Sequence, residues 1–135
     1  MGDPETESVM LRLHGDLAAA CAALKNRDLE KTDLSMHDQH SVTVVAVSGG
    51  YPGPYVKGYD IEGLDLIREA TVFHMGTAGE QQVKTAGGRV LAVSALAPTP
   101  EQAREKAYAE LSRISFMNMY YRKDIGEDLL NRQTP

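Results

Sequence analysis

Two glycines that follow an apolar run are the first residues whose spacing suggests a ligand site. The stretch SGGYPGP at 48–54 could cradle a phosphate or could form a tight turn. No Lys-Ser or Lys-Thr pair follows it, and its spacing is not G-x-G-x-x-G, so it matches neither common phosphate-binding motif. Pro52 and Pro54 also remove two backbone N–H donors that a phosphate nest would use. The residues alone therefore favour a turn or hinge over a ligand loop.

A second candidate is the stretch MYYRKDIG at 119–126. Arg122 and Lys123 are adjacent, follow two tyrosines and precede an expected helix N-terminus after Asp124. A guanidinium, an ammonium and free backbone N–H groups together suit a phosphate. The alternative is a solvated pair of cations with a surface ion pair to Asp124, and the residues alone favour that interpretation.

The remaining reactive side chains give weaker signals. His37 and His40 flank Asp38, but the segment lacks a helical pattern and a third ligand, which argues against a metal site. We expect His74 to be a hydrogen-bonded residue of a strand. Cys21 lies on an alanine-rich face without a cationic neighbour in sequence, so we expect a buried structural thiol and not a nucleophile.

Composition limits the class of protein. The chain has 135 residues, a net charge of −5 and one cysteine, which is about one domain without an internal disulfide. The acidic balance argues against general nucleic-acid binding, which needs clustered Lys and Arg. The N-terminus MGDPETES has no apolar core, and no apolar run approaches the ~20 residues of a spanning helix. We therefore expect a cytoplasmic protein that binds neither membrane nor nucleic acid.

The N-terminal quarter reads as two helices. The first is expected over 4–13, and Gly15 separates it from a second helix that Asp16 can cap. In that second helix we expect an apolar stripe at helical spacing. Its members are Leu17, Ala20, Cys21 and Leu24.

Strands are expected next. A short strand is predicted around Leu34 and Met36, and the run VTVVAVS at 42–48 predicts a strand covered on both faces. The segments 82–85 and 89–97 suggest a hairpin whose turn is the glycine pair in AGG. A further strand is expected over 71–75.

The C-terminal third begins with a clear helix start. Thr99 can cap, Pro100 suits the first helical position, and Gln102 can close a capping box. The expected buried stripe consists of Ala103, Ala107, Leu111 and Ile114. Together the elements predict an α+β domain with a mainly antiparallel sheet and flanking helices.

Several motifs in order resemble a known enzyme family. SGGYPGPYVKGYDIEGLD, VFHMGT, GGRVLAVSAL, PTPEQAREKAYAEL and MYYRKDIG follow the order of the C-terminal domain of phosphoribosylamine–glycine ligase, an ATP-grasp enzyme. The opening GDPETE resembles the segment that closes the ATP-grasp core of that family. The resemblance implies that 1–27 are the helical end of that core or a linker. It also implies that 28–135 are the C-terminal domain, with the rudiment single-hybrid-like fold of ATP-grasp ligases.

This resemblance implies a function. The family joins glycine to 5-phosphoribosylamine with ATP and Mg²⁺ in de novo purine biosynthesis. Its Mg²⁺ ligands lie just before GDPE and are absent here, so we expect a fragment or truncated relative that is inactive alone and holds no cofactor itself. Its expected partners are the missing N-terminal and ATP-grasp domains, and cutting such an interface could permit self-association. The alternative is a non-catalytic phosphoribosyl-ligand binding or interaction module that docks onto separate ATP-grasp lobes.

The resemblance also implies site residues. Arg122 and Lys123 become the expected contacts to the ribose phosphate, which outweighs the solvated-pair interpretation. Asp3 and Glu5 would lie near the substrate amine or glycine. The loop residues expected to face an interdomain cleft are Gly49, Gly50, Tyr51 and Gly53.

Overall fold

A four-stranded antiparallel sheet forms the centre of the protein. In the computed structural model, which describes residues 2–128, its strand order is β4-β7-β3-β8. The strands are β3 (His40–Ser48), β4 (Thr71–His74), β7 (Arg89–Ala97) and β8 (Met119–Tyr120). The predicted α+β class with a mainly antiparallel sheet is confirmed.

The central strand β7 is the most deeply buried element. Every residue from Val90 to Ala95 is buried, because β7 hydrogen-bonds to β3 on one side and to β4 on the other. Val93 lies opposite Val44 of β3 and Val72 of β4. An apolar strand with two neighbours and two covered faces is typical of a sheet centre.

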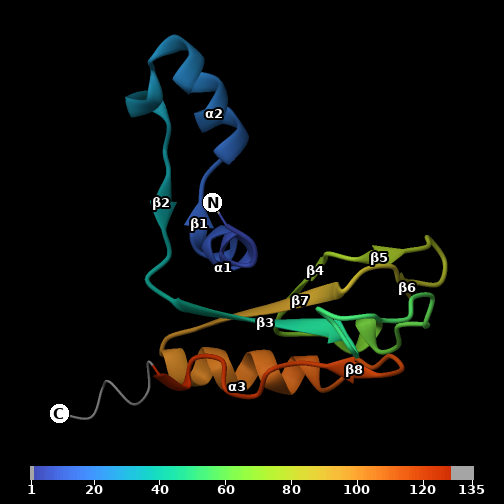
Figure 1. Cartoon of the computed structure of the whole chain (residues 1–135). Coiled ribbons are helices and arrows are strands. Elements are labelled where there is room, and N and C mark those ends of the chain that lie inside the picture. The colour runs from blue at the N-terminus through green and yellow to red at the C-terminus, as the bar shows by residue number, and fades with distance from the viewer. Residues whose placement is uncertain (1, 129–135) are drawn as a thin grey trace.

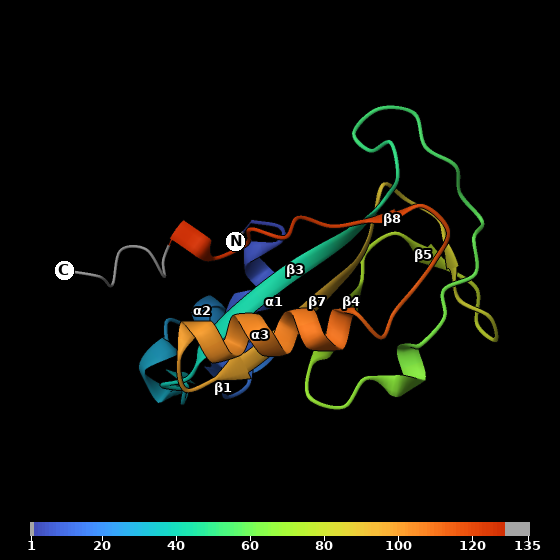
Figure 2. The ribbon, with the colours of Figure 1, turned by 90° about the horizontal axis from the view of Figure 1, so that it is seen from below.

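Helix α3 (Pro100–Leu111) covers one face of this sheet (Figure 2). Thr99 caps it as predicted, since its hydroxyl accepts a hydrogen bond from the Gln102 N–H at 3.3 Å. The predicted stripe is confirmed: Ala103, Ala107 and Leu111 are fully buried and pack with the apolar residues of β3 and β7. Alanines at two of these positions allow the helix to lie close to the strands.

Helix α1 (Glu5–Arg12) lies on the opposite face of the sheet (Figure 1). The Ser8 hydroxyl is 2.6 Å from the Thr43 hydroxyl of β3, which is 2.7 Å from the Ser94 hydroxyl of β7. This line of hydroxyls satisfies polar groups between helix and sheet. The prediction that 42–48 is covered on both faces is confirmed in part, since the α1 side of β3 is only half-buried.

The next segment extends away from the sheet as an arm (Figure 1). It comprises β1 (Leu13–His14), α2 (Leu17–Asn26), the 3-10 turn η1 (Leu29–Lys31) and β2 (Ser35–Met36). The strands β1 and β2 pair with each other, which confirms the short strand near Met36. Asp16 caps α2 as predicted, because its carboxylate accepts the Ala19 N–H at 2.9 Å.

The apolar stripe expected on α2 is not buried. Among its four members only Ala20 is buried, whereas Leu24 is 57% exposed. The expectation of a buried Cys21 is likewise wrong, since this thiol is exposed. The physical reason is that, within residues 2–128, α2 packs mainly against η1 and not against the sheet.

The hairpin predicted between 82–85 and 89–97 is also wrong. The short strand β6 (Lys84–Thr85) pairs with β5 (Thr77–Ala78), while β7 pairs with β3 and β4. The glycines between them bring two backbones together instead of closing a turn. A Cβ on Gly76 would lie 2.7 Å from the Cα of Gly87, so only glycine fits this crossing.

A buried carboxylate ties the connection before β4 to α3. Glu110, 4% exposed, accepts the Arg68 N–H at 2.6 Å and the Glu69 N–H at 3.2 Å. Its carboxylate is also 3.0 Å from Nε of Arg113. The pKa of Glu110 lies below its ordinary value, first because the Arg68 N–H favours the charged form. Sequence patterns did not indicate this residue.

Replacing Glu110 by Ala should lower the free energy of unfolding by about 3 kcal/mol, because it removes a charged acceptor of two part-buried backbone N–H groups and the ion-pair partner of Arg113. Urea unfolding measures this. Glu105→Ala, at an exposed position of the same helix, is the matched control and should have little effect. Because the folded-state pKa is lowered, this stabilisation is present above pH 4.5 and is lost as pH falls through the folded value. Equal losses for both variants, or a pH-independent difference, would contradict this role.

Candidate functional site

Two neighbouring hollows lie at the end of the sheet near the N-terminus of α1. The first has a volume of about 240 Å³, and its floor is formed by Val45 and Val47 of β3. Tyr51 belongs to its wall, and two cations, Arg89 and Arg122, line it as well. The remaining lining residues are Pro4, Thr43, Tyr120, Tyr121 and Ile125. This hollow therefore combines an apolar floor with two guanidinium groups.

The second hollow shares Tyr51 and Arg89 with the first. It has a volume of about 450 Å³, and its other lining includes the carboxylates of Asp3 and Glu7 together with His74. The Arg89 guanidinium lies 3.0 Å from the Asp3 carboxylate, an ion pair that joins the start of β7 to the residues before α1. The two hollows thus form adjacent sites of different polarity, the second of which contains both acidic groups.

The glycine-rich loop forms the turn that carries Tyr51. Gly50 has φ +99°, and the Tyr51 N–H donates to the Ser48 carbonyl at 3.0 Å. Gly49 packs against residue 118, since a Cβ there would lie 2.6 Å from that residue's carbonyl oxygen. A Cβ on Gly53 would lie 3.0 Å from the Gly50 carbonyl oxygen. These three glycines shape the backbone of the loop. Of the four loop residues predicted to face a cleft, only Tyr51 lines the hollows.

Arg122 is held by a two-point ion pair. Its Nε and Nη2 atoms donate to the two Asp124 carboxylate oxygens at 2.9 and 2.7 Å. This hydrogen bonding lowers the pKa of Asp124 and raises that of Arg122. The ion pair expected from the sequence is therefore present, while Nη1 of the guanidinium makes no hydrogen bond within residues 2–128.

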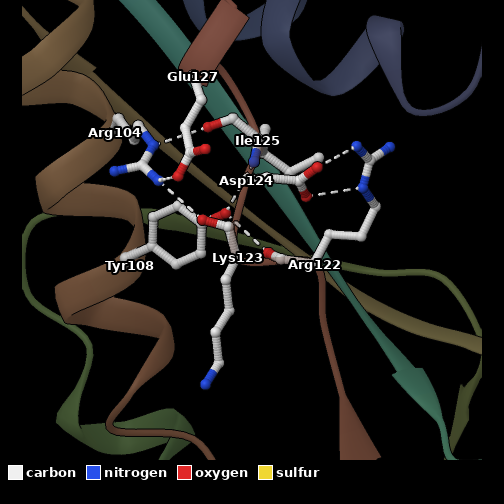
Figure 3. A network of polar contacts seen from close by, with 7 residues as sticks. All are labelled: Arg104, Tyr108, Arg122, Lys123, Asp124, Ile125 and Glu127. Atoms are coloured by element: carbon white, nitrogen blue, oxygen red, sulfur yellow. Dashed lines mark hydrogen bonds and ion pairs between the residues drawn. The ribbon is translucent and has the colours of Figure 1, made fainter.

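The other predicted site residues are dispersed. The Lys123 side chain points away from the Arg122 guanidinium (Figure 3) and does not line either hollow. Asp3 lies in the second hollow, whereas Glu5 is exposed on the first turn of α1 and lines neither. The structure thus brings together Arg122, Tyr51 and Asp3, and it leaves Lys123 and Glu5 apart from them. The helix expected after Asp124 falls largely on 129–135, outside the described residues.

Two residues of α3 hold the segment that carries Arg122 (Figure 3). The Tyr108 hydroxyl donates to the Arg122 carbonyl at 2.7 Å and accepts the Ile125 N–H at 3.2 Å. Arg104 donates to the carbonyls of Lys123 and Ile125 at 2.7 and 2.8 Å. Because Arg104 and Tyr108 are four residues apart, they lie on one face of the helix. Together they hydrogen-bond to the backbone of residues 122, 123 and 125. Burial raises the pKa of Tyr108.

Sequence reasoning missed Arg89 and Glu7 as site residues. Arg89 lies in GGRVL, which looked like the start of a strand, and nothing local indicates that it meets Asp3, which is distant in the chain. A lone Arg after two glycines is the only sequence signal for it. His37 and His40 line neither hollow.

Comparison with known proteins decides the family. The domain family described as phosphoribosylglycinamide synthetase, C domain, matches residues 41–128. The chain belongs to this family. The matched residues include nearly all of the central sheet and the whole of α3. Tyr51, Arg89 and Arg122, which line the first hollow, lie within the match.

Similar proteins agree with the family assignment. The chain is 42% identical over 126 residues to the phosphoribosylamine–glycine ligase of Caldanaerobacter subterraneus subsp. tengcongensis, covering 93% of this chain and 30% of that protein. It is 41% identical over 136 residues to the ligase of Escherichia coli K12, covering 98% and 32%. A bifunctional purine biosynthetic protein of Schizosaccharomyces pombe is 43% identical over 133 residues, covering 96% and 17%. The chain therefore spans about a third or less of the length of these relatives.

A solved structure also resembles this fold. The phosphoribosylamine–glycine ligase from Thermotoga maritima matches with a TM-score of 0.71 and 28% identity, over 93% of this chain and 31% of that one. The α+β fold observed here is thus that of one part of a larger ligase.

Replacing Tyr108 by Phe should loosen the segment that carries Arg122, because the ring stays while both hydrogen bonds of the hydroxyl are lost. We expect amide exchange at Ile125 to accelerate about tenfold, which corresponds to roughly 1.4 kcal/mol. Hydrogen-exchange NMR measures this, with Tyr55→Phe as the matched control. Unchanged exchange at Ile125 would show that Arg104 holds the segment alone.

Proposed function

We propose that this chain serves as the C-terminal part of a phosphoribosylamine–glycine ligase, which converts ATP, 5-phosphoribosylamine and glycine to glycinamide ribonucleotide, ADP and phosphate. Family membership and the high identity to ligases over nearly the whole chain support this proposal. In this assignment 1–27 complete the ATP-grasp core or its linker, and 28–135 form the C-terminal domain. The protein would then work in the cytoplasm, in purine biosynthesis.

The lining of the two hollows is the observation that supports a substrate-binding role for this chain. Phosphoribosylamine has its phosphate and its amine at opposite ends of a ribose ring. The first hollow offers Arg122 to the phosphate over an apolar floor, and the adjoining hollow offers the Asp3 carboxylate to an amine. Arginine binds phosphate oxygens through paired N–H groups. This favours an orientation of the substrate with the phosphate in the first hollow and the amine in the second. The chain would therefore form one wall of the substrate cleft, and Tyr51 would separate its two ends.

The nucleotide and metal belong to other parts of the ligase in this proposal. Among residues 2–128, no three His, Cys, Asp or Glu side chains approach closely enough to hold a metal ion. ATP and Mg²⁺ would activate the glycine carboxylate on the ATP-grasp lobes. The residues of this chain would bind and orient the amine substrate, so we assign them no step in nucleotide chemistry.

The exposed apolar residues of the arm support the proposal that another domain covers it. Helix α2 is rich in alanine and exposes Leu24, and a helix that is apolar on most sides is normally covered. The exposed large apolar residues of the arm and the adjoining α1 are Val9, Leu24, Leu29, Leu34 and Met36. We propose that the ATP-grasp lobes cover them, in the same polypeptide or as a separately encoded partner; without those lobes the chain would self-associate through this surface. Within the described residues, no helix has the length and apolar character that crossing a membrane requires.

Arg122→Ala, made in a ligase that contains this domain, should raise KM for phosphoribosylamine about tenfold or more and leave KM for ATP nearly unchanged. The reason is the loss of a charge-assisted hydrogen bond, about 1.5–3 kcal/mol, to the phosphate alone. Steady-state kinetics with phosphoribosylamine generated in situ measure both constants. Equal increases in the two constants would remove the phosphate-binding role.

The 135-residue chain by itself should form no glycinamide ribonucleotide, because the proposed nucleotide site lies elsewhere in the ligase. The same coupled assay, run with the chain alone, checks this expectation. The complete ligase is the positive control. Product formation by the chain alone at a comparable rate would refute the proposed division of roles.

A further inference from the structure

Two histidines lie side by side at the base of the arm, where β1 and β2 pair (Figure 1). His14 is the last residue of β1, and His37 follows directly after β2. The centres of their rings are 5.4 Å apart, and the ring planes are inclined at 55°. In sequence the nearest histidine to His37 is His40, whereas folding places His37 beside His14.

The register of the two strands explains this pair. Leu13 lies opposite Met36, and His14 lies opposite Ser35. Because successive side chains alternate between the two faces of a strand pair, both histidines share the face of Ser35, and the apolar Leu13 and Met36 occupy the other. A domain that covers the apolar face of this pair would therefore leave the histidine face accessible.

The backbone that carries His37 is fixed at both of its polar groups. The His37 N–H donates to the Arg12 carbonyl at 2.7 Å, which extends the pairing of the two strands. The Arg12 guanidinium donates in turn to the His37 carbonyl, from Nε at 3.3 Å and from Nη2 at 3.1 Å. The charge of Arg12 opposes a second cation nearby, but both histidines are exposed to water, which strongly weakens such repulsion.

The ring nitrogens of the pair are free to bind a ligand. No hydrogen bond within residues 2–128 uses a ring nitrogen of His14 or His37, whereas Nδ1 of His74 is 2.9 Å from the Thr77 hydroxyl. Neutral imidazole binds Zn²⁺, Ni²⁺ and Cu²⁺ through such a nitrogen. Two Zn–N bonds of about 2.0–2.1 Å at a tetrahedral angle place the ring centres about 5 Å apart. The observed separation of the rings therefore fits one shared ion.

We propose that His14 and His37 form a two-histidine site for a divalent transition-metal ion of the Zn²⁺, Ni²⁺ and Cu²⁺ class. Among residues 2–128 no third His, Cys, Asp or Glu joins them, so water completes the coordination and the ion is held less tightly than in a closed four-ligand site. The ion links β1 to β2 and closes the base of the arm, because α2 and η1 lie between these strands in the chain. The two histidines line neither hollow, and their site is independent of the proposed function.

The test is a calorimetric titration of the full 135-residue chain, without an affinity tag, with Zn²⁺ in a non-coordinating buffer. We expect His14→Ala and His37→Ala each to weaken Zn²⁺ binding about tenfold or more, because a single imidazole cannot chelate the ion. The double variant should bind about as weakly as either single variant, since the first substitution already removes the chelate. His40→Ala is the matched control and should bind like the unaltered chain. Mg²⁺ should not bind, because it prefers oxygen ligands.

A second measurement separates metal binding from folding of the arm. His14→Gln keeps a polar side chain at this position but removes the imidazole, so the metal-free variant should retain the slow amide exchange of His37. In the unaltered chain, Zn²⁺ at about ten times its dissociation constant should slow exchange at the His37 amide about tenfold, because the ion stabilises the closed strand pair. The same Zn²⁺ concentration should leave this rate unchanged in His14→Gln.

Four outcomes would contradict the site. Failure of the unaltered chain to bind Zn²⁺ would overturn it. Loss of binding in His40→Ala but not in His14→Ala would show that His37 and His40 chelate the ion instead. Full binding by the double variant would place the ion elsewhere on the chain. Binding that leaves amide exchange at His37 unchanged would refute the proposed link between β1 and β2.

Discussion

The burial of strand β7 is the constraint on which the rest of the structure depends. Its residues from Val90 to Ala95 are all buried, so a strand must pair with β7 on each side and other elements must cover both of its faces. Helix α3 satisfies one face with small residues, and α1 satisfies part of the other through the hydroxyls that join Ser8 to Thr43 and Ser94. The hollows occur at the end of this strand, where that covering stops and Arg89 begins the strand.

Local signals predicted much of the fold because their physical causes are local. Thr99 and Asp16 cap helices through their own side chains, and the run at 42–48 forms a strand because β-branched residues favour extended backbone. Contacts between distant segments could not be predicted from such local signals. The expected hairpin failed because β6 found a partner at 77–78, and glycines at 76 and 87 serve a backbone crossing that composition does not distinguish from a turn.

The same distinction applies to the site. Arg122 and Tyr51 were predicted as site residues because each stands in a recognisable motif, and both line the first hollow. Lys123 was chosen for its neighbour in sequence, although an extended backbone turns its side chain away. Arg89 and Glu110 depend on partners in other segments, Asp3 for the first and the Arg68 N–H for the second, and periodicity carries no information about such pairs. The apolar pattern of α2 predicted the helix, but pattern alone does not say whether its apolar face is covered, and in residues 2–128 only Ala20 of the stripe is buried.

The attachment of both arginines to the sheet has a thermodynamic consequence. Arg89 begins β7, and Arg122 is the second residue after β8, while β3 hydrogen-bonds to both strands and its side chains form the floor of the first hollow. The backbone of Arg89 is therefore placed by strand pairing, whereas the segment that carries Arg122 is held by the side chains of Arg104 and Tyr108. A ligand would meet a frame already ordered by folding and would pay entropy only for the two side chains, about 1 kcal/mol each.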